Sequence, residues 1–331
     1  MSPDDLAALK TDATQELTLR LAIAEYDRTR PLITGRVKPQ GFSLKTTSPH
    51  IGVFCNRPPY EEYDITEMSF SMYVAAKARG EPVIALPIFP LRMAVLAYAY
   101  VRTDSAYKSP RDLVGKKIAS IGYRYTVNLW LRGIFKDHYG LSPEQVTWVT
   151  GEEREGAGYV IPKDVKVEVV LGRTPGELLL AGEVDAVIGP EAPQEFLDGH
   201  PGIRRIFPDT RAECLSYSRK VGFFPVTHVV AMSTASWRKR PWICEPLLDA
   251  FRAAQDQCYA YYYETAKHVM FPDQVFFLEE QRRDWGPDAW PHGVAANRKL
   301  VETFVRYAHE QNYIDRILPV EELFAENMLH T

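Results

Sequence analysis

Two arginines that can bind an anion follow directly after the first apolar segment of the chain. Arg28 and Arg30 come after the run 17–24, in which apolar and polar residues alternate as they do in a strand. A guanidinium matches a carboxylate in two-point geometry, so we expect at least one of the two arginines to contact an anion. The alternative is that Arg28 pairs with Asp27 or Glu25 on the surface.

A second group of candidate residues follows the short segment 63–66. Ser69 and Ser71 lie where a helix is expected to begin, and hydroxyls together with backbone N–H groups at a helix start form an anion site. Ser69 could instead serve only as the helix N-cap. Glu67 lies beside this site and is a candidate proton donor, with a structural ion pair as its alternative role.

Arg92 follows a third apolar segment, 83–89, which is expected to be a buried strand. A lone buried charge is costly, so an arginine at this position needs a partner. We expect that partner to be Glu67 or a carboxylate of the ligand.

The second half of the chain has a corresponding turn, which leads from a predicted strand into a predicted helix. The N-terminus of such a helix favours an anion. The candidate binding residues of this turn are Tyr123, Arg124 and Thr126. Arg132 lies two turns further along the same helix, and we expect it to be structural.

His228 lies inside the strongly apolar segment 226–232. A histidine can accept or donate a proton near neutral pH, but a lone histidine among apolar residues can also be a hydrogen-bonded core residue. The chain has no HxH or HExxH pattern, so any metal site would have to be dispersed, for example Glu67 with His228. Four other histidines are expected in loops or on helical surfaces: His200, His292, His309 and His330.

The elements that position these residues alternate between strands and helices, which predicts an α/β fold with crossover connections and a mostly parallel sheet. Two strand-rich series followed by a helical tail predict two lobes with a ligand cleft between them, at the carboxyl ends of the strands. The expected strands are 17–24, 42–46, 63–66, 83–89, 117–121, 146–150, 167–170, 184–188, 205–207 and 226–232. The expected helices are 67–80, 126–139, 174–181, 242–263 and 294–311. The expected lobes are 17–98 plus 225–331 (lobe 1, discontinuous) and 99–224 (lobe 2), after a poorly ordered leader, 1–16.

The overall charge of the 331-residue chain excludes some partners. A formal net charge of -4 provides no general basic field for nucleic acid or for an anionic membrane surface. No segment reaches the roughly eighteen consecutive apolar residues that span a bilayer, and the acidic N-terminus does not resemble a secretory signal. We therefore expect a cytoplasmic protein that binds neither nucleic acid nor membranes, and the sequence is compatible with a homo-oligomer.

Eight segments, in their order and spacing, resemble one family over residues 17 to 325. They are YDRTRP (26–31), DITEMSFS (64–71), IFPLRM (88–93), DLVGK (112–116), WVTG (148–151), AGEVDA (181–186), FPVTH (224–228) and NRKLVETF (297–304). The family is that of the 4,5-dihydroxyphthalate decarboxylases, which belongs to the type 2 periplasmic-binding-protein fold superfamily. The N-terminal extension, Arg57 with the two prolines after it, and the turn 122–126 depart from the family pattern, so the exact substrate stays open.

This resemblance implies a non-oxidative decarboxylase of a hydroxylated aromatic carboxylate. Arginines 28, 30 and 92 would hold the carboxylate that is retained. His228 would help to deprotonate the phenol and Glu67 would supply a proton to the ring, although these two roles are interchangeable. No organic cofactor is required, and a divalent metal ion is compatible with the scheme. The alternative function is a cytoplasmic small-anion-binding protein without catalysis.

Overall fold

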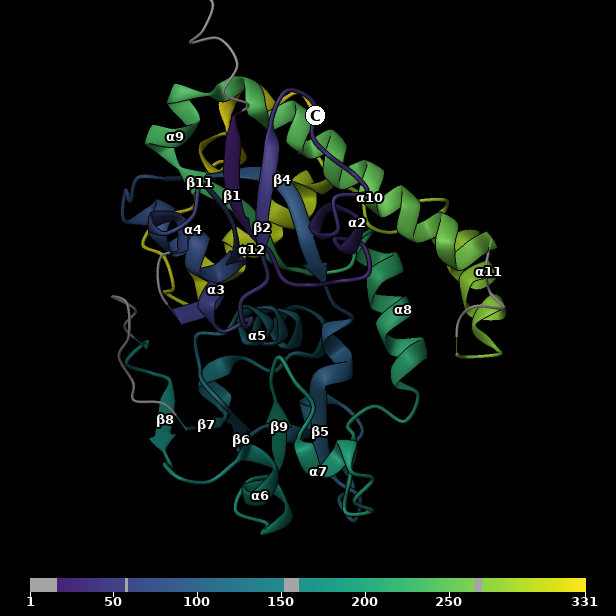
Figure 1. Ribbon diagram of the computed structural model, residues 1–331. Helices are drawn as coiled ribbons and strands as arrows, with labels where there is room; N and C mark the ends of the chain where they lie inside the picture. The colour runs from purple at the N-terminus through teal and green to yellow at the C-terminus, as the bar shows by residue number, and fades with distance from the viewer. Residues whose placement is uncertain (1–16, 57–58, 152–160, 265–269) are drawn as a thin grey trace, which may run out of the picture.

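The computed structural model describes residues 17–56, 59–151, 161–264 and 270–331, which form two β-sheets with helices around them (Figure 1). The predicted leader, 1–16, lies outside the described residues. The two sheets occupy the upper and lower halves of the view, and helix α5 (Thr126–Tyr139) lies between them. No helix of the described residues is both long and apolar enough to cross a membrane.

The upper sheet has the strand order β2-β1-β3-β11-β4. Its strands are β1 (Thr18–Ala22), β2 (Ser43–Thr47), β3 (Ile65–Ser69), β4 (Val83–Arg92) and β11 (Val226–Ser233). The strand β1 runs parallel to β2 and β3, whereas β11 runs antiparallel to both of its neighbours, β3 and β4. The strands β4 and β11 are buried along almost their whole length, in agreement with their largely apolar sequences, whereas the fully buried strand β3 carries the polar residues Thr66, Glu67 and Ser69.

The lower sheet has the order β10-β5-β9-β6-β7-β8. Its strands are β5 (Ala99–Arg102), β6 (Lys117–Ser120), β7 (Thr147–Thr150), β8 (Lys166–Val169), β9 (Ala186–Ile188) and β10 (Ile203–Arg205). The strands from β6 to β9 pair in parallel, but β5 is antiparallel to both β9 and β10. Both sheets are therefore mixed: parallel pairs are in the majority in the lower sheet, as expected, but parallel and antiparallel pairs are equal in number in the upper sheet. The antiparallel strands β5 and β11 begin directly after the chain has passed from one sheet to the other.

The helices agree with the sequence pattern where apolar periodicity is strong. Helix α5 has its predicted bounds, and Gly140, with a φ of 67°, ends it in the left-handed conformation that glycine adopts at no steric cost. The sequence pattern did not predict several short helices of the described residues, nor two helices of 12 residues each, α8 (Thr210–Val221) and α11 (Gln274–Trp285). The other helices are α2 (Arg30–Ile33), α3 (Val53–Asn56), α4 (Phe70–Ala78), α6 (Pro175–Leu180), α7 (Gln194–Leu197), α9 (Thr234–Lys239), α10 (Cys244–Glu264), α12 (Arg298–Glu310) and α13 (Val320–Leu323).

The two lobes share buried apolar contacts where α5 meets α12. Trp130 on α5 packs against Phe304 and Tyr307 on α12, with ring centroids 5.1 and 5.7 Å apart. Its indole N–H also donates to the backbone carbonyl of Val226, at the start of β11, over 2.8 Å. This contact fixes the N-terminal end of α5 next to the upper sheet.

Gly133 allows this close approach of α5 and α12. A Cβ atom at this position would lie only 2.3 to 2.6 Å from three ring carbons of Tyr307. We expect Gly133→Ala to lower the free energy of unfolding by about 1–3 kcal/mol, because overpacking a filled core outweighs the gain of about 1 kcal/mol in helix propensity. Urea denaturation followed by circular dichroism measures the change.

Gly176→Ala in α6 is the matched control for this substitution. There the added Cβ would meet only the end of the flexible Glu195 side chain, which can rotate away. This variant should be as stable as the parent or more stable. If both variants have the same free energy of unfolding, the account of the α5–α12 contact is wrong.

Candidate active site

A cavity of about 300 Å³ lies between the two lobes. From the upper lobe it is lined by the ends of β3 and β4, by the start of β11 and by residues 50–52. From the lower lobe it is lined by the start of α5 and by Pro190 and Glu191, after β9. Its polar lining residues are His50, Ser69, Tyr125, Thr126, Glu191, Thr227 and His228. This is the place, beyond the strand ends of both sheets, where the sequence pattern predicts a ligand.

The antiparallel register of β3 and β11 brings the central residues together. His228 pairs directly with Ser69, and Val230 pairs with Glu67. Side chains two residues apart on a strand share one face of the sheet, so Glu67 is the diagonal neighbour of His228. Long side chains can meet across such a diagonal, and here they do.

Glu67 and His228 form a buried hydrogen-bonded pair. Glu67 is fully buried, and its Oε1 atom lies 2.5 Å from His228 Nδ1. The same carboxylate accepts hydrogen bonds from the Tyr26 hydroxyl (2.7 Å) and from the Ala24 backbone N–H (2.9 Å), both of which follow β1. Because this carboxylate already accepts from two donors, we infer that it also accepts from His228, which assigns a proton to Nδ1 of His228. The other ring nitrogen, Nε2, is then on the opposite edge of an imidazole that lines the cavity.

Hydroxyl groups link the two lobes at the edge of the cavity. Ser69 Oγ lies 3.0 Å from Thr126 Oγ1, and Thr126 Oγ1 also contacts the hydroxyl and the backbone N–H of Ser71, at 2.9 and 3.1 Å. Ser69 occupies the N-cap position of α4, but its side chain makes no capping hydrogen bond. The simple capping role therefore does not account for Ser69. Ser69 and Thr126 line the cavity, whereas Ser71 is buried next to them.

The N-terminal ends of α4 and α5 meet at this cavity. Neither N-cap residue, Ser69 nor Tyr125, makes a side-chain capping hydrogen bond. The first N–H groups of a helix carry partial positive charge and attract anions. Two such helix ends from different lobes give the cavity a local preference for a carboxylate although the chain is acidic overall.

The structure does not bring the arginines of the first lobe to this cavity. Arg30 forms an exposed ion pair with Glu25 (3.1 Å), and Arg28 pairs with Asp27 (3.1 Å), as in the alternative considered for Arg28. Arg28 donates to the carbonyl of Pro90 and lies between the rings of Tyr26 and Trp290, with its guanidinium carbon 4.2 Å from each centroid. Arg28 thus contacts the tyrosine that binds Glu67, rather than the cavity.

Arg92 has different partners from those expected. It is buried, and instead of Glu67 its guanidinium bonds the carbonyls of Phe224 (3.2 Å) and Pro291 (2.6 Å) and the side-chain oxygen of Asn297 (2.5 Å). Burial lowers the pKa of Arg92 to about 10. These bonds tie the end of β4 to the C-terminal part of the chain, which is a structural role.

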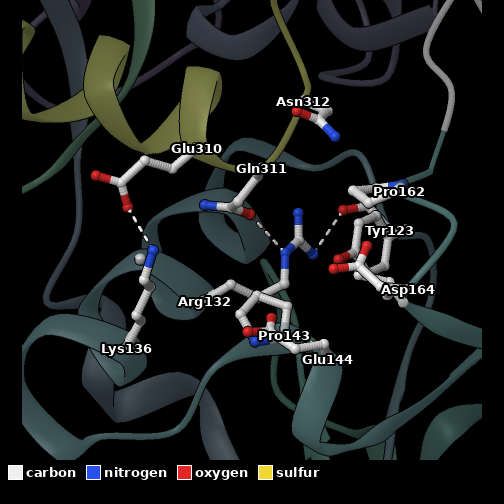
Figure 2. A pocket seen from close by; sticks show the side chains of 12 residues that line it. Tyr123, Arg132, Lys136, Pro143, Glu144, Pro162, Asp164, Glu310, Gln311 and Asn312 are labelled. Atoms are coloured by element: carbon white, nitrogen blue, oxygen red, sulfur yellow. Dashed lines mark hydrogen bonds and ion pairs between the residues drawn. The ribbon is translucent and has the colours of Figure 1, made fainter.

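Tyr123 and Arg124 also point elsewhere. The ring of Tyr123 is stacked on the Arg132 guanidinium, with the guanidinium carbon 3.7 Å from the ring centroid, and it lines a second, separate cavity (Figure 2). Arg124 presents its backbone carbonyl to the Ser71 hydroxyl, at 3.4 Å, and does not line the cavity between the lobes. The turn 122–126 therefore contributes Thr126 and the neighbouring Tyr125 to that cavity.

Several residues of the site were missed from the sequence. Tyr26 stands inside the YDRTRP segment, and Tyr125 precedes Thr126, so both were within recognised motifs. Thr227 likewise lies in the FPVTH segment, whereas His50 and Glu191 are isolated polar residues without a local pattern. Among the described residues that line the cavity there is no lysine or arginine, and Arg57 is outside the described part of the chain.

A metal site has no support in the described part of the chain, where no group of three or more His, Cys, Asp or Glu residues could hold an ion. Glu67 and His228 do lie together, as a dispersed site would require. However, Nδ1 of His228 is occupied by the bond to Glu67.

Comparison with solved structures defines the class of fold. The structure is similar to the periplasmic sulfonate-binding protein SsuA from Methylobacillus flagellatus KT, with a TM-score of 0.58, 16% identity, and coverage of 96% of this chain and 94% of that one. It is also similar to the alkanesulfonate-binding protein SsuA from Xanthomonas axonopodis pv. citri bound to MOPS, with a TM-score of 0.56, 14% identity, and coverage of 95% and 99%. The chain has a type 2 periplasmic-binding-protein fold.

Comparison with curated sequences shows the family. The chain is 33% identical to the 4,5-dihydroxyphthalate decarboxylase of Comamonas testosteroni over 325 residues, which are 93% of this chain and 96% of that protein. It is 35% identical to the enzyme of the same name from Pseudomonas putida over 221 residues, 62% of this chain and 84% of that one. No family model matches the chain. The chain belongs to the 4,5-dihydroxyphthalate decarboxylase family, a family of carboxy-lyases. This membership does not favour the alternative function, a binding protein without catalysis.

His292, which was expected in a loop or on a helical surface, is in a loop but is buried against β4. Its Nδ1 atom accepts a hydrogen bond from the backbone N–H of Phe89, at 3.2 Å. Burial, with the nearby positive charges of Arg92, Arg252 and Arg28, lowers the pKa of His292 from 6.5 to about 3. The native state therefore holds this histidine neutral in a pH range where the unfolded chain protonates it.

His292 should therefore lower the free energy of unfolding when the pH falls below 6.5. As the pH falls from 6.5 towards 3, the unfolded state binds one more proton than the native state, which costs up to about 1.4 kcal/mol per pH unit. His292→Asn keeps an acceptor for Phe89 but cannot titrate, so between pH 6 and 4.5 its free energy of unfolding should fall less steeply than that of the parent. Urea denaturation at several pH values measures the two slopes, with the exposed His330→Asn as control. Parallel slopes for the parent and His292→Asn would contradict the assignment.

Proposed function

We propose that this chain is a non-oxidative decarboxylase of a hydroxylated aromatic carboxylate of the 4,5-dihydroxyphthalate type. The observation that carries the proposal is the buried Glu67–His228 pair, whose imidazole lines the cavity between the lobes. The names of the two curated relatives support the same reaction class and the same substrate type.

The reaction requires one proton and no redox step. Electrons from a ring hydroxyl para to the leaving carboxylate move towards the ring carbon that bears it. A proton is added to that carbon, the bond to the carboxylate carbon breaks, and CO2 leaves as the ring becomes aromatic again. The protein must therefore orient the ring, hold the retained carboxylate and deliver a proton to one carbon atom.

His228 is the residue that we propose delivers this proton. Its Nδ1–H is directed at Glu67, so Nε2 is the atom through which the ring can transfer a proton into the cavity. The buried carboxylate of Glu67 stabilises the protonated imidazole, in the way that an acidic partner orients and stabilises a catalytic histidine. Glu67 does not line the cavity, so we propose that His228, and not Glu67, supplies the proton to the ring, and that Glu67 positions His228.

The ends of α4 and α5 are proposed to hold the retained carboxylate. Ser69 and Thr126 supply hydroxyl donors there, and the backbone N–H groups of the two helix starts add partial positive charge. The aromatic ring would pack on the apolar lining residues Leu91, Met93, Ile121 and Val127. A cavity of about 300 Å³ suits a ligand of this size.

A direct test is to incubate the purified protein with 4,5-dihydroxyphthalate and related hydroxylated acids, with and without a divalent metal ion, and to follow CO2 and the phenolic product. His228→Ala should lower kcat by about 10²–10⁴-fold, as expected when a catalytic acid is lost. Glu67→Gln should lower kcat by at least about 100-fold with little change in KM, because it no longer orients and stabilises the imidazole. Ser69→Ala should act mainly on KM.

The control for these variants is His330→Asn, which lies on the surface and should retain the parent kcat. If none of the acids in the panel is turned over and bound ligand is recovered unchanged, the proposal of a decarboxylase is wrong and the protein is a binding protein. If His228→Ala and Glu67→Gln both retain the full kcat, the protein is still a decarboxylase, but the proposed roles of these two residues are wrong.

A further inference from the structure

A second cavity, of about 160 Å³, is lined on one side by Tyr123, in the turn 122–126 (Figure 2). It is also lined by Arg132 and Lys136 of α5, by residues 143, 144, 162, 164 and 165 of the lower lobe, and by residues 310–312 at the end of α12. Its volume is several times the 10–15 Å³ or so that one buried water requires, so it can hold a small molecule. None of its lining residues lines the cavity of the proposed active site.

Arg132 is the anchor of this second cavity. It is 1% exposed; its Nε donates to Gln311 Oε1 (2.7 Å) and its Nη1 donates to the backbone carbonyl of Tyr123 (2.8 Å). Its Nη2 atom is buried and has no hydrogen-bond partner among the described residues. In Figure 2 this third nitrogen points away from both bonds, towards Asn312. A buried donor left without an acceptor costs about 1–3 kcal/mol, more when it is charged, so this atom marks the place for an acceptor from outside the chain.

The charges around Arg132 restrict what that acceptor can be. Within the described ranges no carboxylate forms an ion pair with Arg132, and Lys136 is already paired with Glu310 at 2.9 Å. Two further carboxylates line the cavity, those of Glu144 and Asp164, and both residues are exposed. An oxyanion would be attracted by Arg132 and repelled by these two carboxylates. A ligand that carries both charges would satisfy each side.

We infer that this cavity binds a small zwitterion of the α-amino-acid class. Its carboxylate accepts from Arg132 Nη2, deep in the cavity, and its ammonium group faces Glu144 and Asp164 at the mouth. The site is independent of the proposed decarboxylase activity, because the two cavities have no lining residue in common.

Titration calorimetry on the full chain tests this inference with three probes: glycine, acetate and inorganic phosphate. Glycine should bind, and more tightly than acetate or phosphate. The double variant Glu144→Gln/Asp164→Asn should weaken glycine binding about fivefold, as expected when roughly 1 kcal/mol of exposed ion pairing is lost, and should not weaken acetate binding. Both positions are on the surface, so this variant should fold.

Two variants at the anchor assign the binding to this cavity. Arg132→Gln should abolish glycine binding, although removal of a buried arginine could also unfold the chain. Asn312→Asp avoids that problem, because residue 312 has a φ of 55°, which aspartate tolerates, and the new carboxylate competes for Arg132. It should abolish glycine binding in a folded protein. The inference is overturned if glycine does not bind, if acetate or phosphate binds as tightly, or if Asn312→Asp or the double variant leaves glycine affinity unchanged.

Discussion

The antiparallel insertion of β11 between β3 and β4 is the constraint on which the site depends. It sets His228 opposite Ser69 and diagonal to Glu67, and the parallel neighbour β1 ends where Ala24 and Tyr26 reach the same carboxylate. A shift of one residue in this register would turn His228 to the other face of the sheet. The contact between α5 and α12 then holds the start of α5 against the site, so that Thr126 meets Ser69 across the lobes.

Glu67 shows how this arrangement makes a fully buried acid tolerable. An isolated buried carboxylate would be strongly destabilising, but three donors from β11 and from the segment after β1 surround this one. The same bonds direct the Nδ1 proton of His228 towards Glu67, while the imidazole lines the cavity. Folding energy and the proposed chemistry therefore depend on the same hydrogen bonds.

Much of this could be predicted from the sequence, since apolar segments mark strands and polar residues at their ends mark a site. The sequence analysis named Glu67, Ser69, Thr126 and His228, which the structure places at or directly beside the cavity, although Glu67 and His228 lie within β3 and β11. It could not tell which way a long arginine turns, and Arg92 bonds backbone carbonyls because the C-terminal segment folds over it. Sequence patterns also missed α8 and α11, whose polar composition hides their periodicity, and the antiparallel direction of β5 and β11, which depends on where the chain crosses between sheets.

The most direct test of the central claim is the protonation of His228 itself. ¹⁵N NMR of histidine-labelled protein, at a pH where the imidazole is neutral, distinguishes a proton on Nδ1 from one on Nε2. The account predicts the proton of His228 on Nδ1, directed at Glu67, and a loss of this preference in Glu67→Gln. A neutral His228 with its proton on Nε2, or a tautomer that does not change in Glu67→Gln, would contradict it.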